Sequence, residues 1–191
     1  MVKEKKRCGW CTTDPEYIAY HDEEWGVPIR DSDALYKLLM LEGMQAGLSW
    51  LTILRKRAAM GKAFFEFDLD RLANSGDKEI SQWLNNSEII RHRGKLQALI
   101  DNAQAVLTMD DFVDFIWQFE PSKRRCYISQ SDVPASTPES SEMSRALKKA
   151  GFKFVGPTIC YAFMQSAGLV NDHMKECWRF EYCEDLQTSG R

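Results

Sequence analysis

Hydrophobic residues recur at three- and four-residue spacing from about Asp31 onward, and alternating apolar and polar positions are scarce. The first spacing places apolar side chains on one face of a helix, whereas alternation is typical of a strand. No internal repeat or low-complexity tract interrupts the pattern. The sequence therefore predicts an all-α protein.

Six helices follow from the first two-thirds of the chain. One begins at a cap, Asp31 or Ser32, and is loosened by Gly43 and Gly47. It buries four leucines: Leu35, Leu38, Leu39 and Leu41. A second ends in the basic run 55–57, because cations suit a helix C-terminus, and buries Leu48, Leu51, Ile53 and Leu54. Short helices are predicted near Leu69–Ala73 and Lys78–Leu84. The most regular amphipathic run is Glu88–Leu107, and Pro121 stops a short aromatic helix at Phe112–Phe119.

Two more helices are predicted beyond a long loop, 120–141, which is rich in Ser, Pro and charge. The first carries Met143 and Leu147 and ends at Gly151. A tight turn, 153–157, leads into the second, which runs from Thr158 toward Ala167 and ends at Gly168. The sequence thus predicts a helix, a hairpin and a helix.

The sequence of the hairpin allows two interpretations of its role. Backbone N–H groups at a helix N-terminus bind phosphate, Gly156 allows close approach, and Lys153 makes the turn basic. Lys153, Gly156 and Thr158 are therefore candidates for contact with the DNA backbone. The alternative is an ordinary turn between two helices.

Composition and charge narrow the function classes. The 191 residues are 44% hydrophobic and 28% charged, which is typical of one globular domain. The net charge of −3 argues against a protein that coats DNA indiscriminately, but allows a local basic face. No apolar stretch is long enough for a membrane span, and the charged N-terminus lacks the apolar region of a secretion signal. We therefore expect a cytoplasmic protein with no membrane contact.

The cysteines and histidines suggest a metal site. Six cysteines are too scattered for a disulfide scaffold. Four nitrogen or sulfur ligands complete a tetrahedral structural zinc site, and His173-x3-Cys177 would place two on one face of a helical turn. Five candidates are available, and spacing favours Cys11 among them: Cys8, Cys11, His21, His173 and Cys177. The alternatives are buried structural thiols, or a redox dithiol at Cys8 and Cys11.

A carboxylate in an apolar setting is a further candidate. Glu42 lies between Leu41 and Gly43, where its charge needs donors or a cavity. Aromatic residues that belong to no simple apolar stripe lie before and after it: Tyr17, Tyr20, Trp25 and Trp50. A functional carboxylate and a solvated charge at a helix end both remain open on this pattern.

Several long motifs, in order, resemble those of bacterial 3-methyladenine DNA glycosylase I, a helix-hairpin-helix glycosylase family. The resemblance covers about residues 7–177, and its motifs are Arg7-Cys8-Gly9-Trp10, Tyr17-Ile18-Ala19-Tyr20-His21-Asp22, Glu24-Trp25-Gly26-Val27-Pro28, Leu41-Glu42-Gly43, Gln45-Ala46-Gly47-Leu48-Ser49-Trp50, Ile89-Ile90-Arg91-His92-Arg93-Gly94-Lys95, Gly151-Phe152-Lys153-Phe154-Val155-Gly156 and Leu169-Val170-Asn171-Asp172-His173.

The resemblance implies one domain at 1–177, built as two helical lobes around a base-binding cleft. It also implies a tail at 178–191 whose order the sequence leaves open, as it does for 120–141. A structural zinc ion would join the two ends of the chain, bound by Cys8, His21, His173 and Cys177 rather than by Cys11.

The implied activity is base-excision repair of alkylated double-stranded DNA. The family flips 3-methyladenine out of the duplex, since the glycosidic bond cannot be reached inside the stack. By this resemblance Trp50 stacks on the base, and Glu42 and Tyr20 bond its edge. Tyr17 and Trp25 line the pocket. Glu42 accepts from the exocyclic amine of adenine, whereas the carbonyl of guanine would repel it.

Two departures bear on the chemistry. Asn171 stands where related glycosylases place a catalytic aspartate, so strong chemical catalysis from that position is not expected, and Asp172 is a weak substitute candidate. Thr158 stands where bifunctional relatives have a lysine nucleophile, so we expect hydrolysis to free 3-methyladenine and an abasic site, without lyase activity.

A monomer associated with the nucleoid through its substrate is expected. The alternative function is a non-catalytic, zinc-stabilised module that binds alkylated DNA.

Overall fold

The computed structural model describes residues 5–189, and the regular secondary structure in this range is helical apart from one isolated bridge between Tyr127 and Met174. The prediction of an all-α fold is thereby confirmed. In chain order the elements are α1 (Pro15–Glu23), α2 (Ser32–Gln45), α3 (Trp50–Ala63), the short 3₁₀ helix η1 (Phe65–Phe67), α4 (Leu69–Ala73), α5 (Asp77–Leu84), α6 (Arg93–Leu107), α7 (Phe112–Trp117), the 3₁₀ helix η2 (Gln130–Asp132), α8 (Pro138–Lys149), α9 (Pro157–Ser166) and α10 (Phe180–Ser189). None of the described helices is long and apolar enough to cross a membrane.

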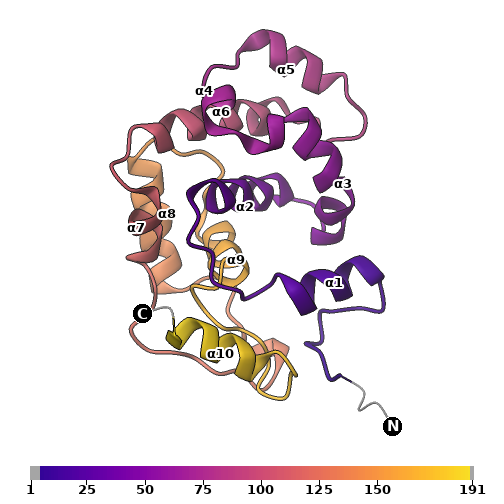
Figure 1. Ribbon diagram of the computed structural model, residues 1–191, viewed down its shortest axis with the longest axis vertical. Coiled ribbons are helices and arrows are strands. Elements are labelled where there is room, and N and C mark those ends of the chain that lie inside the picture. Colours follow the sequence, from indigo (N-terminus) through magenta and orange to yellow (C-terminus); the bar gives the residue numbers. More distant parts are fainter. Residues whose placement is uncertain (1–4, 190–191) are drawn as a thin grey trace.

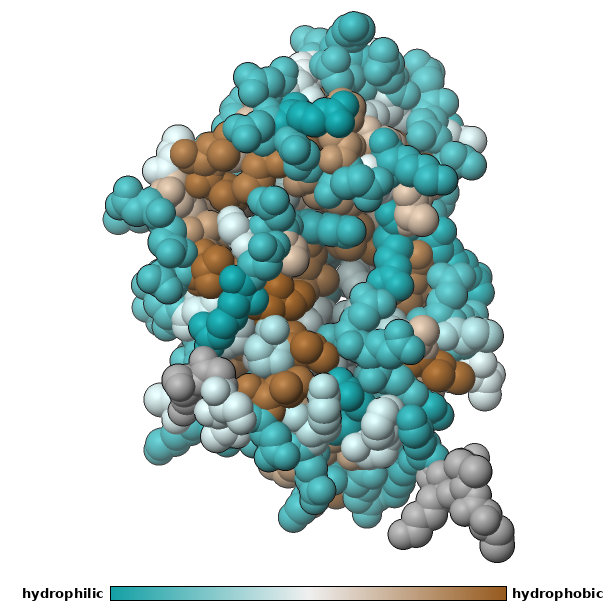
Figure 2. Space-filling view, in the orientation of Figure 1, coloured by the Kyte–Doolittle hydropathy of each residue, from teal (hydrophilic) through white to brown (hydrophobic). Residues whose placement is uncertain are grey.

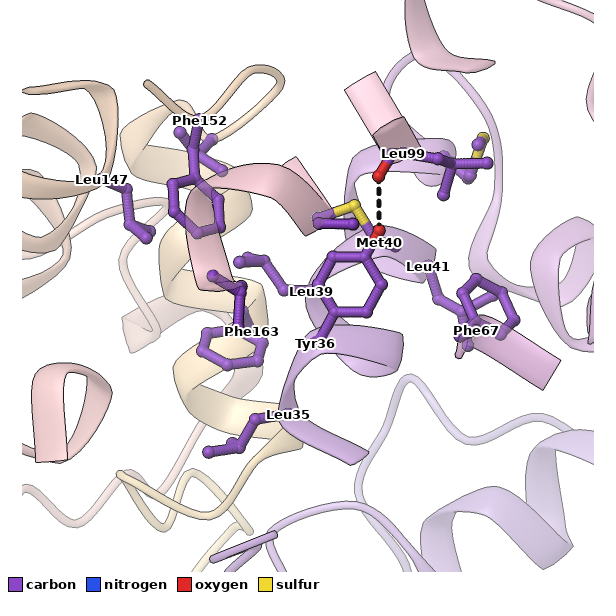
Figure 3. Close-up of a cluster of buried hydrophobic side chains, with 14 of the residues drawn as sticks. Leu35, Tyr36, Leu39, Met40, Leu41, Phe67, Leu99, Leu147, Phe152 and Phe163 are labelled. Atoms are coloured by element: carbon purple, nitrogen blue, oxygen red, sulfur yellow. Dashed lines mark hydrogen bonds between the residues drawn. The ribbon is translucent and has the colours of Figure 1, made fainter. Parts of the chain in front are cut away.

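Helix α2 lies in the middle of the molecule, where it packs against α3, α6, α7 and α9 (Figure 1). Its leucines Leu35 and Leu39 are fully buried. The hydroxyl of the equally buried Tyr36 donates to the carbonyl of Leu99 on α6 across 2.6 Å (Figure 3). A satisfied hydroxyl in the core fixes how α2 and α6 pack, because an unpaired one would be costly.

The helix boundaries differ from the sequence predictions at several places, and α7, for example, ends at Trp117 rather than at Phe119. Helix α3 continues past the basic run to Ala63, and Leu48, which was expected to point inward, precedes the helix and is 43% exposed. Helix α6 begins at Arg93 rather than at Glu88, because the side chain of His92 accepts from the backbone N–H of Lys95 and caps it there. The apolar Ile89 is still buried, but in the turn before the helix.

Two α-helices were not predicted at all. Helix α1 is capped by Asp14, whose side chain accepts from the backbone N–H of Glu16, and it has proline at its first position. Helix α10 occupies most of the segment 178–191, whose order the sequence left open, and it buries Cys183 and Gln187. Both helices are short, so tertiary packing rather than a long apolar stripe stabilises them.

The loop predicted at 120–141 is shorter in the structure, because α8 begins at Pro138, and the loop is held to the rest of the molecule at several points. Arg124 pairs with Glu184 of α10 at 2.9 Å, and Arg125 pairs with Glu139 of α8 at 3.2 Å. The backbone carbonyl of Tyr127 accepts from the N–H of Lys175. The loop therefore runs against the C-terminal part of the chain, and it contributes η2 to the site described below.

The hairpin between α8 and α9 has a defined geometry. Gly151 and Phe154 have positive φ angles of 98° and 56°. The side chain of Asn102 binds both backbone groups of Lys153 in the turn: it accepts from the N–H at 2.8 Å and donates to the carbonyl at 3.1 Å. Ser144 donates to the carbonyl of Val155. These bonds tie the turn to α6 and α8.

Candidate active site and metal centre

A cavity of about 260 Å³ opens where α1, α2, α3 and α9 meet, and its size suits a single planar ring system. In Figure 2, hydrophilic side chains surround several groups of hydrophobic ones on the face shown, and a hollow lies near its centre. The cavity is lined by Trp10, Tyr17, Tyr20, Trp25, Glu42, Gln45, Trp50, Gln130, Ala162, Gln165 and Ser166. All five residues predicted from the sequence as catalytic or base-binding are among them.

The sequence analysis missed the other six residues of this lining. Ser166 and Gln165 are polar residues at the end of the otherwise apolar helix α9, which was the available signal. Gln130 lies on η2 in the long loop, where no periodicity marked it. Their place in the cavity depends on which segments the fold brings together.

Glu42 supplies the one carboxyl group that the described residues place in the lining. It is 2% exposed, and its Oε1 accepts from the hydroxyl of Ser166 at 2.7 Å. The Ser166 oxygen in turn accepts from the hydroxyl of Tyr20 at 2.9 Å. These bonds form a chain from α1 through α9 to α2.

The second carboxylate oxygen of Glu42, Oε2, is buried and has no hydrogen-bond partner in the described part of the chain. Burial raises the pKa of Glu42 to about 8, while the bond from Ser166 acts in the opposite direction. A buried polar atom without a partner costs free energy, which a ligand donor would relieve. A hydrogen-bond donor at Oε2 favours the ionised form of Glu42, which then offers an acceptor to a bound molecule.

Aromatic rings form the walls around this acceptor. Tyr20 and Trp50 lie with their ring centroids 5.3 Å apart, and Trp10 contacts Tyr17 and Trp25 at 5.8 and 4.9 Å. The indole N–H of Trp50 is buried and has no hydrogen-bond acceptor among residues 5–189. Ring faces of this kind stack on nucleobases. The cavity thus combines stacking surfaces with one unmatched acceptor and one unmatched donor.

Lys95 holds the loop that connects Glu42 to Trp50. It is 7% exposed, and its ammonium group donates to the carbonyls of Met44 at 2.9 Å and Ala46 at 2.6 Å. Burial lowers the pKa of Lys95. Since the last turn of α2 has no basic residue of its own, Lys95 supplies the positive charge that suits a helix C-terminus. Lys95 thereby fixes the loop between two walls of the cavity, that of Glu42 and that of Trp50.

A second cluster lies beside the aromatic walls and contains two thiols and two imidazoles. Cys8, His21, His173 and Cys177 are all buried, and their ligand atoms lie within 4.8 Å of one another. The Sγ atom of Cys177 is 3.4 Å from Nε2 of His21 and 3.5 Å from Nδ1 of His173. With zinc bond lengths, a tetrahedral site has a sulfur-to-nitrogen edge of about 3.5 Å. The donor set and its spacing therefore fit a metal ion.

The other nitrogen of each imidazole already has an acceptor. Nδ1 of His21 is 2.8 Å from the carboxylate of Asp22, and Nε2 of His173 is 3.0 Å from the carbonyl of Trp25. Burial opposes the ionisation of Asp22, but the two hydrogen bonds from Arg7 and the contact with His21 hold its pKa well below the usual range. Metal-binding histidines usually have such partners, because these fix the tautomer and the ring orientation.

The two thiols differ in acidity because each affects the ionisation of the other. The neighbouring Cys8 thiol and then the two imidazoles lower the pKa of Cys177, and the same contact and burial raise the pKa of Cys8. A thiolate is the form of cysteine that binds metal.

The structure corrects two predictions about this cluster. Cys11, which spacing favoured, is absent from it: its thiol is partly exposed and lies 3.7 Å from the carbonyl of Tyr17. His173 and Cys177 were expected on one helical turn, but the segment between them is a series of turns and not a helix. The backbone N–H of Met174 donates to Cys8, and that of Cys177 donates to the carbonyl of Met174.

Asn171 and Asp172 do not line the aromatic cavity. The amide of Asn171 donates to the carbonyl of Phe180 and to Glu184, so it anchors the start of α10. Both residues line a different cavity, on the side of the loop 120–141. The predicted backbone-binding residues lie at the hairpin, where Lys153 and Thr158 are exposed and Gly156 caps α9.

Comparison with known proteins shows to which family the chain belongs. Residues 10–180 match the model of a family described as methyladenine glycosylase. The chain belongs to the methyladenine glycosylase family. The match includes every residue of the cavity lining and three of the four clustered metal-ligand candidates, His21, His173 and Cys177.

Relatives of this methyladenine glycosylase family member are similar over nearly their whole length. The DNA-3-methyladenine glycosylase 1 of Escherichia coli K12 is 50% identical over 179 residues, which is 90% of this chain and 95% of that protein. The DNA-3-methyladenine glycosylase of Haemophilus influenzae is 46% identical, over 90% of this chain and 96% of that protein. A crystal structure of 3-methyladenine DNA glycosylase I superposes with a TM-score of 0.88 at 50% identity, and covers 91% of this chain and 98% of that one.

Proposed function

We propose that this protein removes 3-methyladenine from alkylated DNA by hydrolysing its N-glycosidic bond, as a step of base-excision repair. The main support is the unpartnered Oε2 of Glu42 in an aromatic cavity of about 260 Å³. Relatives named DNA-3-methyladenine glycosylase support it, and a solved structure at 37% identity is a tyrosine variant in complex with 3-methyladenine. Another is a glutamate-to-glutamine variant of the Staphylococcus aureus protein.

The base must leave the duplex before it can enter this cavity. Unstacking and unpairing cost a few kcal/mol, which stacking on Trp50 and the other rings offsets. Glu42 Oε2 accepts a hydrogen bond from the exocyclic amine. The Ser166 hydroxyl, which itself accepts from Tyr20, donates to the other carboxylate oxygen and holds it in place. Tyr17 and Trp25 complete the walls.

The reaction breaks the bond between C1′ of the sugar and N9 of the base. Alkylation at N3 gives the base a positive charge in the nucleotide, so the bonding electron pair leaves with the base and neutralises it. Water then adds to C1′ and releases a proton to solvent, which leaves an abasic site. Because the leaving group is already activated, little electrostatic help is required. The position of Asn171 and Asp172 outside the cavity agrees with this mechanism, and Thr158 in place of a lysine agrees with the absence of a lyase step.

The hairpin residues Lys153, Gly156 and Thr158 are proposed to hold the DNA backbone. The N-terminus of α9 presents free backbone N–H groups, and Lys153 adds a positive charge beside it. We further propose that helices on either side of the cavity act as two lobes of a single domain of residues 1–177, with α10 packed onto it. The protein is expected to act as a monomer.

The metal is proposed to be a structural zinc ion held by Cys8, His21, His173 and Cys177. Two thiolates and two imidazoles in a buried cluster are a typical zinc donor set, and four protein ligands leave no open position for substrate. Its role would be to join the segment around Cys8 to the segment around Cys177, which are far apart in the chain. That connection positions Trp10 and Trp25, whose rings contact His21 and His173.

The test is to incubate the protein with DNA that contains 3-methyladenine and to follow the released bases by chromatography, beside a Glu42→Gln variant. Release of 3-methyladenine with little 7-methylguanine, lost in the variant, would support the proposal. Equal release by both proteins would remove Glu42 from it. Tight binding of the alkylated DNA without release would favour the non-catalytic binding module instead.

A further inference from the structure

Gln165 stands between the base cavity and a buried carboxyl group that the mechanism does not use. It lies on the last turn of α9, half-buried, and lines the cavity beside Ser166. Its amide nitrogen donates to Oδ2 of Asp172 across 2.7 Å. Asp172 is 3% exposed and also accepts from the hydroxyl of Tyr161 at 2.5 Å. Two donors therefore converge on one oxygen of a buried carboxylate.

This contact fixes which way the amide of Gln165 is turned. A carboxylate only accepts hydrogen bonds, so the nitrogen and not the oxygen of the amide must face Asp172. The two atoms leave the same planar carbon in different directions. No hydrogen bond to the side-chain oxygen of Gln165 exists in residues 5–189. Asp172 lines a different cavity, whereas Gln165 lines the base cavity, so the Gln165 side chain lies between the two.

We infer that Asp172 is a positioning residue that holds the Gln165 side-chain oxygen as a second hydrogen-bond acceptor in the base cavity, and that this acceptor helps select an exocyclic amine over a carbonyl. The inference rests on the proposed function and names a specificity determinant of the same site. Glu42 Oε2 and Gln165 Oε1 are then two acceptors on neighbouring walls, on α2 and α9.

The chemistry of the two purines explains why the orientation matters. Adenine presents an amine at C6 and therefore donates two N–H groups, whereas guanine presents a carbonyl oxygen there. Two acceptors favour the amine and repel the carbonyl. If the amide of Gln165 turned over, its NH₂ group would offer guanine a donor, and the selectivity would fall. Asp172 prevents that rotation, because its carboxylate cannot donate to the amide oxygen.

The experiment measures the preference for 3-methyladenine over 3-methylguanine in the full chain, as release from alkylated DNA and as binding of the free bases followed by tryptophan fluorescence. In Asp172→Asn the new amide can donate to Gln165, which frees Gln165 to turn over. We expect the preference to fall about tenfold, the usual size of one lost hydrogen bond of this kind. The double variant Gln165→Glu with Asp172→Asn should recover most of it, because the amide introduced at position 172 then donates to a carboxylate whose other oxygen faces the cavity.

Two further variants separate positioning from folding. Gln165→Leu removes the second acceptor at a half-buried position and should show the same loss of preference. It therefore tests the inference even if Asp172→Asn fails to fold. Asn171→Ala breaks the contacts to Phe180 and Glu184, so it should lower the melting temperature and leave the preference unchanged. An unchanged preference in Gln165→Leu, or in a folded Asp172→Asn, would overturn the inference. No release and no binding of 3-methyladenine by the unmodified protein would instead overturn the proposed function.

Discussion

The hydroxyl of Ser166 lies 2.7 Å from Oε1 of Glu42, although the two residues are 124 positions apart in the sequence. The bond joins the last turn of α9 to the end of α2, and it leaves the other carboxylate oxygen free for a ligand. Because Tyr20 donates to the same serine, one small side chain aligns residues from three helices.

Replacement of Ser166 by alanine should weaken binding of 3-methyladenine by about fivefold to thirtyfold, the range for one hydrogen bond to a charged or buried group. The loss arises because Tyr20 and Glu42 both lose their common partner. Tryptophan fluorescence titration with the free base measures it. Ser144→Ala is the matched control: Ser144 is also buried, but it donates to Val155 in the hairpin and should affect stability without changing binding of the free base.

The stability of the protein should depend on pH through Glu42. Burial raises the pKa of this carboxyl from 4.5 to about 8, so the native state holds its proton more tightly than the unfolded chain does. The favourable contribution is therefore complete below pH 4.5 and is lost as the pH rises toward 8. A Glu42→Gln variant carries no such group. Its free energy of unfolding should therefore rise relative to that of the unmodified protein, by on the order of 3 kcal/mol as the pH rises from about 5.5 to about 9.

Urea unfolding of both proteins at these two pH values measures the difference in the free energy of unfolding. The same stability gap at both values would mean that the carboxyl is already ionised in the native state at the lower pH.

Removal of the metal should destabilise the protein and expose thiols. The proposed ligands Cys8 and Cys177 are buried, and both should react with a thiol reagent only after a chelator has been added. A Cys8→Ser variant should lose bound zinc and melt at a lower temperature. Cys11→Ser is the control, since Cys11 lies outside the cluster and its loss should leave one zinc ion per chain. Full thiol reactivity before chelation would argue against a metal site.

Lys153 should matter for DNA affinity and not for the base itself. It is exposed at the hairpin, and its backbone is held by Asn102. Lys153→Ala should weaken binding of duplex DNA uniformly across sequences and reduce the dependence of log K on log salt by about one unit. Binding of free 3-methyladenine should not change. Weaker binding of the free base would show that the hairpin supports the cavity rather than the backbone.

Local patterns in the sequence were enough to predict the helices with long apolar stripes and to indicate the family. The leucines of α2 and the apolar residues of α6 predicted their helices, because three- and four-residue spacing requires no knowledge of distant segments. The motifs around Glu42, Trp50 and Lys153 indicated the family, and the family supplied the base-binding and metal-ligand candidates. Glu42 alone, as a charge beside Leu41, left its role open.

The packing of the core established which of these residues lie together. Spacing preferred Cys11 as a metal ligand, yet the backbone turns between His173 and Cys177 bring Cys8 into the cluster and leave Cys11 outside it. Ser166, Gln165 and Gln130 joined the cavity lining only when α9 and the long loop packed beside α2. Local spacing determines which face of a helix is apolar, but contacts between segments far apart in the chain depend on how the whole core packs, and no local pattern encodes them.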